Sequence, residues 1–63
     1  MQLYQHRVVN EKTDLDDRLE KLEGFIGCTV FLGLPAAEQD RLNRQVVLMR
    51  ALSAVLAERI QAF

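Results

Sequence analysis

The chain has 63 residues and a mass of 7.2 kDa, which limits it to one small domain. Eight Lys and Arg nearly balance nine Asp and Glu; a dedicated DNA- or RNA-binding module is therefore not expected, because such modules carry a basic field. With one cysteine and one histidine, the chain can form neither an internal disulfide nor a Cys/His metal cluster.

The N-terminal segment gives no sign of export or of membrane insertion. Residues 1–10 are polar and lack the apolar core of a signal peptide. The longest apolar stretch, residues 25–37, has about 13 residues, too few to cross a bilayer. With a single cysteine, these features predict a cytoplasmic protein without a membrane-spanning segment.

The first predicted element is a helix over about residues 5–26. Apolar or long side chains recur there at steps of three and four, the period of a helix stripe. The stripe consists of Tyr4, Val8, Lys12, Leu15, Leu19, Leu22 and Ile26. On the opposite face, acids precede bases by four residues, which supports an exposed helix. These pairs are Asp14–Arg18 and Asp17–Lys21. Gly24 and Gly27 are candidate stop signals.

A short connector over residues 27–34 follows, with the sequence GCTVFLGL. It is unusually apolar for a loop, because loops normally lie on the surface. We therefore expect Val30, Phe31 and Leu34 to pack beneath the helices, in one short helical turn.

The second predicted helix covers about residues 35–62. Pro35 suits a first helical turn because that position needs no amide donor. The stripe consists of Leu42, Val46, Met49, Ser53, Leu56, Ile60 and Phe63. Further apolar side chains lie outside this stripe, at Val47, Leu48, Leu52 and Val55 and at four alanines. A helix that is apolar on more than one face needs more than one neighbour.

These elements predict an all-α fold, an antiparallel αα-hairpin forming a single domain over residues 1–63. A short connector makes two helices antiparallel neighbours. Because a chain this small barely offsets its conformational entropy alone, and disulfides and metals are not available to it, self-association is the remaining means of stabilisation. We predict a homo-oligomeric helical bundle.

The candidate nucleophiles and bases do not form a catalytic arrangement. Cys28 and His6 lie at opposite ends of the first helix, some 30 Å apart by helix rise. We interpret Cys28 as a small packed residue. The acidic run over residues 14–23 matches no calcium-binding loop and reads as a solvated helix face. The sequence therefore predicts no enzyme, no metal site and no cofactor.

Residues near the two chain ends form the strongest candidate binding site. Tyr4, His6, Arg7 and Lys12 combine an aromatic ring, an imidazole and two cations, and Arg59 is a further cation near the other end. An antiparallel hairpin brings the two chain ends together, which adds Phe63 to this group. Cations beside an aromatic ring suit the phosphate and the base of a nucleotide. Alternatively, Lys12 pairs with Glu11 or Glu58, and Tyr4 is a hydrophobic end-plug.

The order of several motifs resembles a family of small phage and prophage proteins named after a protein of a crAss-like phage. The motifs are Y-Q-x-R-V-V-x-E-K-x-x-L-D from Tyr4, K-L-x-x-F-I from Lys21, L-P-x-x-E-Q from Leu34 and L-x-x-R-I-x-x-F from Leu56. The resemblance covers nearly the whole chain and departs from the family in the connector.

The family is similar in size and hairpin character to phage proteins that sequester nucleotide signals of the CBASS and Thoeris defence systems. The resemblance implies a phage-encoded anti-defence protein in the cytoplasm of an infected bacterium. It would bind an ADP-ribose-derived or cyclic oligonucleotide signal at subunit interfaces, through Tyr4, His6, Arg7, Lys12 and Arg59. The alternative is a non-catalytic helical module that clamps a host or phage protein.

Overall fold

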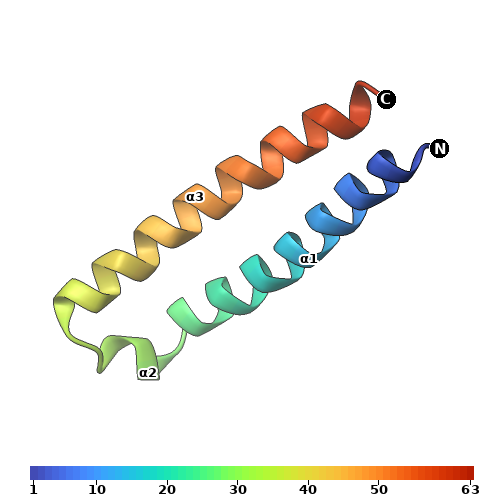
Figure 1. The fold of residues 1–63 in the computed structure, drawn as a ribbon. Coiled ribbons are helices and arrows are strands. Elements are labelled where there is room, and N and C mark those ends of the chain that lie inside the picture. Colours follow the sequence, from blue (N-terminus) through green and yellow to red (C-terminus); the bar gives the residue numbers. More distant parts are fainter.

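The computed structural model describes all 63 residues, and three helices account for most of them. α1 spans Leu3–Ile26, α2 spans Thr29–Leu32 and α3 spans Ala36–Gln61. α1 and α3 run side by side in opposite directions, so both chain ends lie at one end of the molecule and α2 lies at the other (Figure 1). The molecule measures 46 × 14 × 13 Å. The predicted all-α antiparallel hairpin is confirmed.

The helix ends follow the expected chemistry with small shifts. α1 begins at Leu3, two residues earlier than expected, because the Gln2 backbone N–H finds an acceptor in Gln5 Oε1 at 2.7 Å. α1 ends before Gly27, whose N–H donates to the Glu23 carbonyl at 3.1 Å. Gly24 lies inside α1 and does not end the helix, although it was a candidate stop signal. Pro35 directly precedes α3, and its carbonyl accepts the Glu38 and Gln39 amides.

The connector contains the expected short helical turn, α2. Phe31 is buried and meets the edge of Phe25, with ring centroids 6.2 Å apart. Gln39 Nε2 donates to the Leu34 carbonyl at 2.9 Å, which fixes the connector to the first turns of α3. The expectation for Val30 is wrong: its side chain is 64% exposed. A single helical turn that points Phe31 at the hairpin directs its neighbours outward.

The core is a thin seam between α1 and α3. Val8 and Leu15 from α1 meet Leu56 from α3, and Met49 and Ile60 pack against them. These residues belong to the two predicted stripes. Only five of the 63 residues are buried, because two helices alone can cover just one face of each other.

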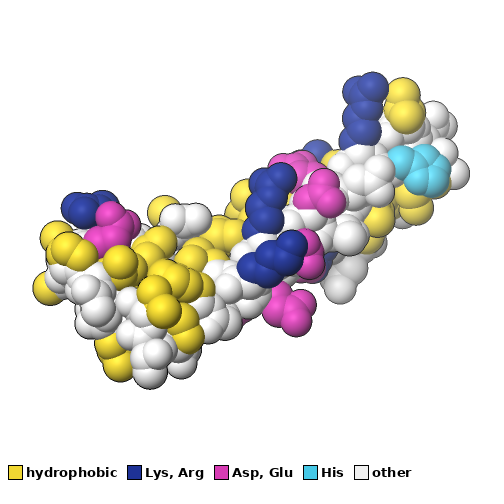
Figure 2. Space-filling view, turned by 90° about the horizontal axis from the view of Figure 1, so that it is seen from below, with side chains coloured by type: hydrophobic (Ala, Val, Ile, Leu, Met, Phe, Trp, Pro, Cys, Tyr) yellow, Lys and Arg dark blue, Asp and Glu magenta, His cyan; other side chains and the backbone are white.

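Charged side chains line the surface between the two ends. Lys21 Nζ lies 3.1 Å from Asp17, as the spacing predicts, whereas Asp14 and Arg18 form no ion pair. Figure 2 shows hydrophobic side chains gathered at the connector end and charged side chains spread along the middle. None of the helices combines the length and the hydropathy that a membrane crossing requires.

Candidate ligand-binding site

The two chain ends meet through an aromatic pair. Tyr4 lies in the first turn of α1, and Phe63 follows the end of α3. Their ring centroids are 5.9 Å apart with an interplanar angle of 80°, an edge-to-face contact. Tyr4 is nevertheless an exposed residue. The predicted approach of Tyr4 and Phe63 is therefore present, and part of each ring remains open to a ligand.

Two arginines lie within four residues of this aromatic pair along the chain. Arg7 is three residues after Tyr4, a spacing that places both on one face of α1. Arg59 is four residues before Phe63, in the last turn of α3. Both arginines are exposed and neither forms an ion pair. We call Tyr4, Arg7, Arg59 and Phe63 the terminal cluster.

Most other cations of this chain have a carboxylate partner, which Arg7 and Arg59 lack. Five of the eight Lys and Arg side chains have carboxylate partners within 4.0 Å. The unpaired ones are Arg7, Arg18 and Arg59. Two of these three belong to the terminal cluster, so positive charge that is free to meet an anion gathers at the chain ends.

His6 is close to the terminal cluster in sequence but faces away from it. Two residues along an α-helix correspond to a rotation of about 200°, so His6 and Tyr4 project from nearly opposite sides of α1. His6 is exposed and has no hydrogen bond to any residue of the cluster. A single hairpin therefore does not bring this imidazole and the Tyr4 ring to one ligand.

Lys12 takes part in a polar contact between the helices instead. Its Nζ lies 2.5 Å from Asp16 Oδ2, and Ser53 Oγ donates to Asp16 Oδ1 at 2.5 Å. The partner of Lys12 is thus Asp16, and not Glu11 or Glu58 as the alternative interpretation had it. Five residues rotate Lys12 by about 140° from Arg7, which carries it to another side of α1.

The environment of Asp16 favours its ionised form. The hydrogen bond from Lys12 is the main cause of a lowered pKa of this carboxyl, and the bond from Ser53 adds to it against a smaller opposing effect of burial. Sequence reasoning missed this contact. The signal was a polar residue, Ser53, within an otherwise apolar stripe, which needs a hydrogen-bond partner when a second helix covers it.

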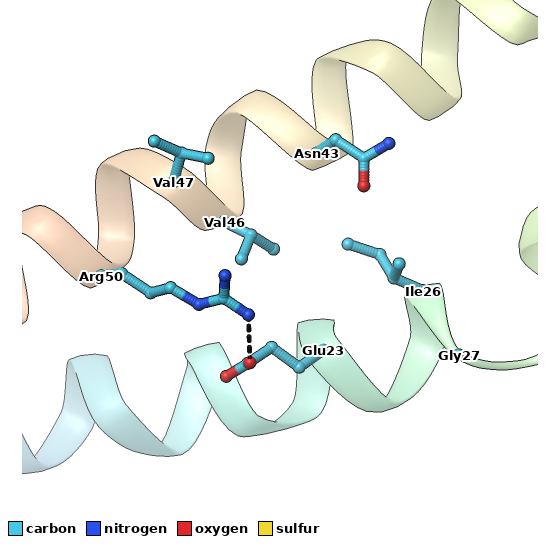
Figure 3. Close-up of a pocket in the computed structure, with 7 residues that line it drawn as sticks. All are labelled: Glu23, Ile26, Gly27, Asn43, Val46, Val47 and Arg50. Carbon is cyan, nitrogen blue, oxygen red and sulfur yellow. Dashed lines mark hydrogen bonds and ion pairs between the residues drawn. The ribbon is translucent and has the colours of Figure 1, made fainter.

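A hollow of about 370 Å³ lies between α1 and α3 in the connector half of the hairpin. Its lining residues are Glu23, Ile26, Gly27, Asn43, Val46, Val47 and Arg50. Figure 3 shows Arg50 reaching across the hollow, where its Nη2 lies 2.6 Å from Glu23 Oε2. The ion pair balances the charge in the hollow. No sequence motif marks the hollow.

Outside the terminal cluster, the side chains that could bind a metal ion are dispersed. No group of three or more His, Cys, Asp or Glu side chains is placed to hold a metal ion. Cys28 is a free, partly buried thiol at the start of α2. The terminal cluster therefore offers the only gathering of unpaired cations beside aromatic rings.

Comparison with known proteins gives one match. The family model described as Sequestin matches residues 2–62, nearly the whole chain. No curated protein sequence and no solved structure gives a significant match. The match covers the same part of the chain as the motifs found in the sequence, and the phage origin stays a prediction.

Proposed function

The chain belongs to the Sequestin family, and we propose that it is a phage-encoded anti-defence protein that sequesters a nucleotide immune signal. In this proposal, the chain forms a homo-oligomer in the cytoplasm of the infected bacterium. It holds an ADP-ribose-derived or cyclic oligonucleotide signal where its subunits meet. The family's name supports sequestering as the general role, and the terminal cluster supports a nucleotide as the ligand.

The observation that carries the proposal is the pairing of free guanidinium groups with accessible aromatic rings. Arg7 and Arg59 have no carboxylate partner, and the rings of Tyr4 and Phe63 meet edge to face between the two helix ends. Guanidinium groups bind phosphate oxygens through charge-assisted hydrogen bonds. Aromatic faces stack on nucleobases. A phosphate and a base therefore find complementary groups within one cluster.

The other two predicted ligand residues have different roles in this proposal. Lys12 is held by Asp16 and stabilises the hairpin. His6 faces away from the cluster and reaches a ligand only if that ligand lies against a second subunit. The four residues of the terminal cluster are all exposed in a single chain, so the cluster is open. A second subunit would enclose the ligand and exclude water.

Sequestering by this protein requires tight binding and no chemical step. The captured signal is expected to be released unchanged when the protein is denatured. A ligand present at 100 times its dissociation constant adds about 2.7 kcal/mol to the free energy of unfolding, which a small helical protein shows clearly as a rise in melting temperature.

The test is a thermal-shift screen against cyclic dinucleotides, cyclic trinucleotides and cyclic ADP-ribose isomers, followed by calorimetry on any ligand that binds. Arg7→Glu and Arg59→Glu are expected to abolish binding while the helical content stays unchanged. Arg18→Glu is the matched control, because Arg18 is also exposed and unpaired but lies outside the terminal cluster. Equal losses in all three variants, or no ligand in the screen, would overturn the proposal.

Mass spectrometry of the ligand released by heating separates binding from catalysis. Recovery of the intact ligand supports sequestering, whereas a cleaved product would identify an enzyme. If no nucleotide binds and a host or phage protein co-purifies instead, the chain is a protein-clamping module. The apolar side chains that α3 exposes away from α1, such as Leu48 and Val55, are the feature that favours this second function.

A further inference from the structure

The side of α3 that points away from α1 is apolar in its middle and uncovered. Leu48, Leu52 and Val55 are all exposed there, and Leu48 keeps 70% of its surface accessible. Ala51 lies among them and is also exposed. We call these four residues the outer face of α3. No charged residue interrupts α3 between Arg50 and Glu58, so the outer face carries no charge.

The molecule exposes more surface than a compact monomer of its mass. Its accessible surface is 4702 Å², whereas the size relation for monomeric proteins gives about 4,100 Å² for this mass. The excess of about 600 Å² approaches the roughly 800 Å² that each partner buries in a stable protein interface. One further helical neighbour would therefore bring the chain to the burial typical of its size.

Residues on this side of α3, within the outer face and on either side of it, repeat in the pattern of a coiled-coil seam. Steps of four and three residues keep one side of a helix facing a partner helix. The seam residues are Ala37, Arg41, Arg44, Leu48, Ala51, Val55, Glu58 and Ala62. The middle of this seam is apolar, and opposite charges lie towards its two ends.

The seam is complementary to itself when a second copy runs in the opposite direction. Residues equidistant from the midpoint between Met49 and Arg50 then face each other. Arg41 and Glu58 are equidistant from this point, as are Leu48 and Ala51. Each copy therefore places a base opposite an acid and a large side chain opposite a small one. Such alternation lets side chains of two helices interdigitate.

We propose that the outer face of α3 binds the outer face of α3 in a second copy of this chain, antiparallel, about a two-fold axis between Met49 and Arg50. Leu48 packs against Ala51 of the partner subunit. Arg41, whose Nη2 lies 3.2 Å from Glu38 Oε2 in its own chain, also faces Glu58 of the partner subunit. A two-fold interface uses the same patch on both subunits, so every favourable contact occurs twice.

Arg44 is the one charged seam residue that faces an apolar neighbour, Val55 of the partner subunit. Its guanidinium is held at the side of the seam by Asp40, whose Oδ2 lies 3.1 Å from Arg44 Nε. The aliphatic part of an arginine can cover apolar surface while its charged head stays in water. Arg44 therefore fits this arrangement without burying an unpaired charge.

This interface specifies the homo-oligomer on which the proposed function rests. In the antiparallel pair, Arg59 of one subunit lies beside the first half of α3 in its partner, so a ligand at the terminal cluster touches both subunits. Assembly and ligand binding are nevertheless measured separately. A dimer with this interface that binds no nucleotide would contradict the proposed ligand alone, and a nucleotide-binding protein without this interface would contradict the inference alone.

Disulfide cross-linking tests the antiparallel arrangement directly. In a Cys28→Ser background, the double variant Ala37→Cys, Ala62→Cys is expected to form a covalent dimer on mild oxidation. Each single variant is expected to stay monomeric on a denaturing gel, because equivalent cysteines would be about 37 Å apart along the helix. A disulfide needs Cα atoms within about 7 Å. Cross-linking of the single variants would show a parallel pair, and no cross-link in the double variant would overturn the interface.

Charge reversal tests the Arg41–Glu58 pairing. Sedimentation equilibrium is expected to show self-association about tenfold weaker for Arg41→Glu and for Glu58→Arg, because each change places like charges opposite each other twice. The double variant is expected to regain association close to that of the original protein. Arg18→Glu is the control and is expected to change nothing. A double variant as weak as the single variants would contradict the pairing.

Discussion

The inner face of α3, through Val46, Met49 and Leu56, packs against α1, whereas the outer face leaves Leu48 and Val55 in water. Both faces consist of aliphatic residues at helical spacing. The difference is that the inner side also carries Ser53, which donates to Asp16, and Arg50, which pairs with Glu23. Aliphatic residues supply the driving force for packing on either side, and on the inner side directional polar contacts accompany them.

The largest expected difference between the two faces concerns Leu56, which is 1% exposed. Leu56→Ala is expected to lower the free energy of unfolding by about 2–5 kcal/mol, because it removes buried methyl groups and leaves a cavity. Urea denaturation followed by circular dichroism measures this change. At protein concentrations too low for self-association, Leu48→Ala is expected to change the free energy of unfolding by less than about 0.5 kcal/mol. Equal changes in the free energy of unfolding for the two substitutions would contradict the difference in burial between the two faces.

On the outer face, Leu48→Lys is expected to weaken self-association of the chain. Burying a leucine contributes about 1.5–3 kcal/mol, so the dissociation constant of the dimer is expected to rise at least tenfold. The melting temperature of the original protein is expected to increase with protein concentration, and that of the variant is not. Size-exclusion chromatography with light scattering and a dilution series of melting curves measure both properties. An unchanged mass in solution would leave the outer face without a role in assembly.

The polar contact on the inner face predicts a pH dependence. Hydrogen bonds from Lys12 and Ser53 lower the pKa of Asp16 in the folded chain. The resulting stabilisation is complete above the ordinary pKa of an aspartate, about 4, and is lost as the pH falls through the lower folded value. Asp16→Asn is expected to flatten the fall in melting temperature below about pH 4. Asp14→Asn, at an exposed aspartate without a hydrogen bond, should leave the profile unchanged.

The smallest expected effect concerns the ion pair across the hollow. Arg50 and Glu23 are both largely solvated, although their atoms lie 2.6 Å apart. Exposed ion pairs contribute at most about 1 kcal/mol and weaken in salt. Arg50→Gln is therefore expected to lower the free energy of unfolding by less than that amount, and the difference from the original protein is expected to vanish in 1 M sodium chloride. A larger, salt-independent loss would show that the hollow is a tightly packed part of the core.

Much of the fold follows from periodicity. The stripes that contain Val8, Leu15 and Leu56 were identified from spacing, and these residues form the core. The connector was expected to turn once as a helix, and it does so in α2. The orientation of individual side chains in that turn was not predictable, because four residues are too few to show a period. Val30 was consequently placed inside although it lies outside.

The candidate site was predictable only in part. An antiparallel hairpin brings the chain ends together, so the meeting of Tyr4 and Phe63 followed from the topology. The separation of His6 and Lys12 from Tyr4 and Arg7 follows from their spacing along α1, whereas the side of α1 that faces α3 does not. Contacts with α3, such as the bond from Ser53 to Asp16, fix which side of α1 faces α3.

By itself, the sequence determined the helical class, the antiparallel hairpin, the positions of the helix ends to within two residues and the excess of apolar surface. These properties depend on spacing, on turn residues and on composition, all of which are local. Only the tertiary structure decided the partner of Lys12, the free state of Arg7 and Arg59, and the side of α3 that remains uncovered. The last two depend on how one helix lies against the other, through contacts between residues far apart in the chain. Asp16 lies four residues after Lys12 on the same helix, and it also accepts a hydrogen bond from Ser53 of α3.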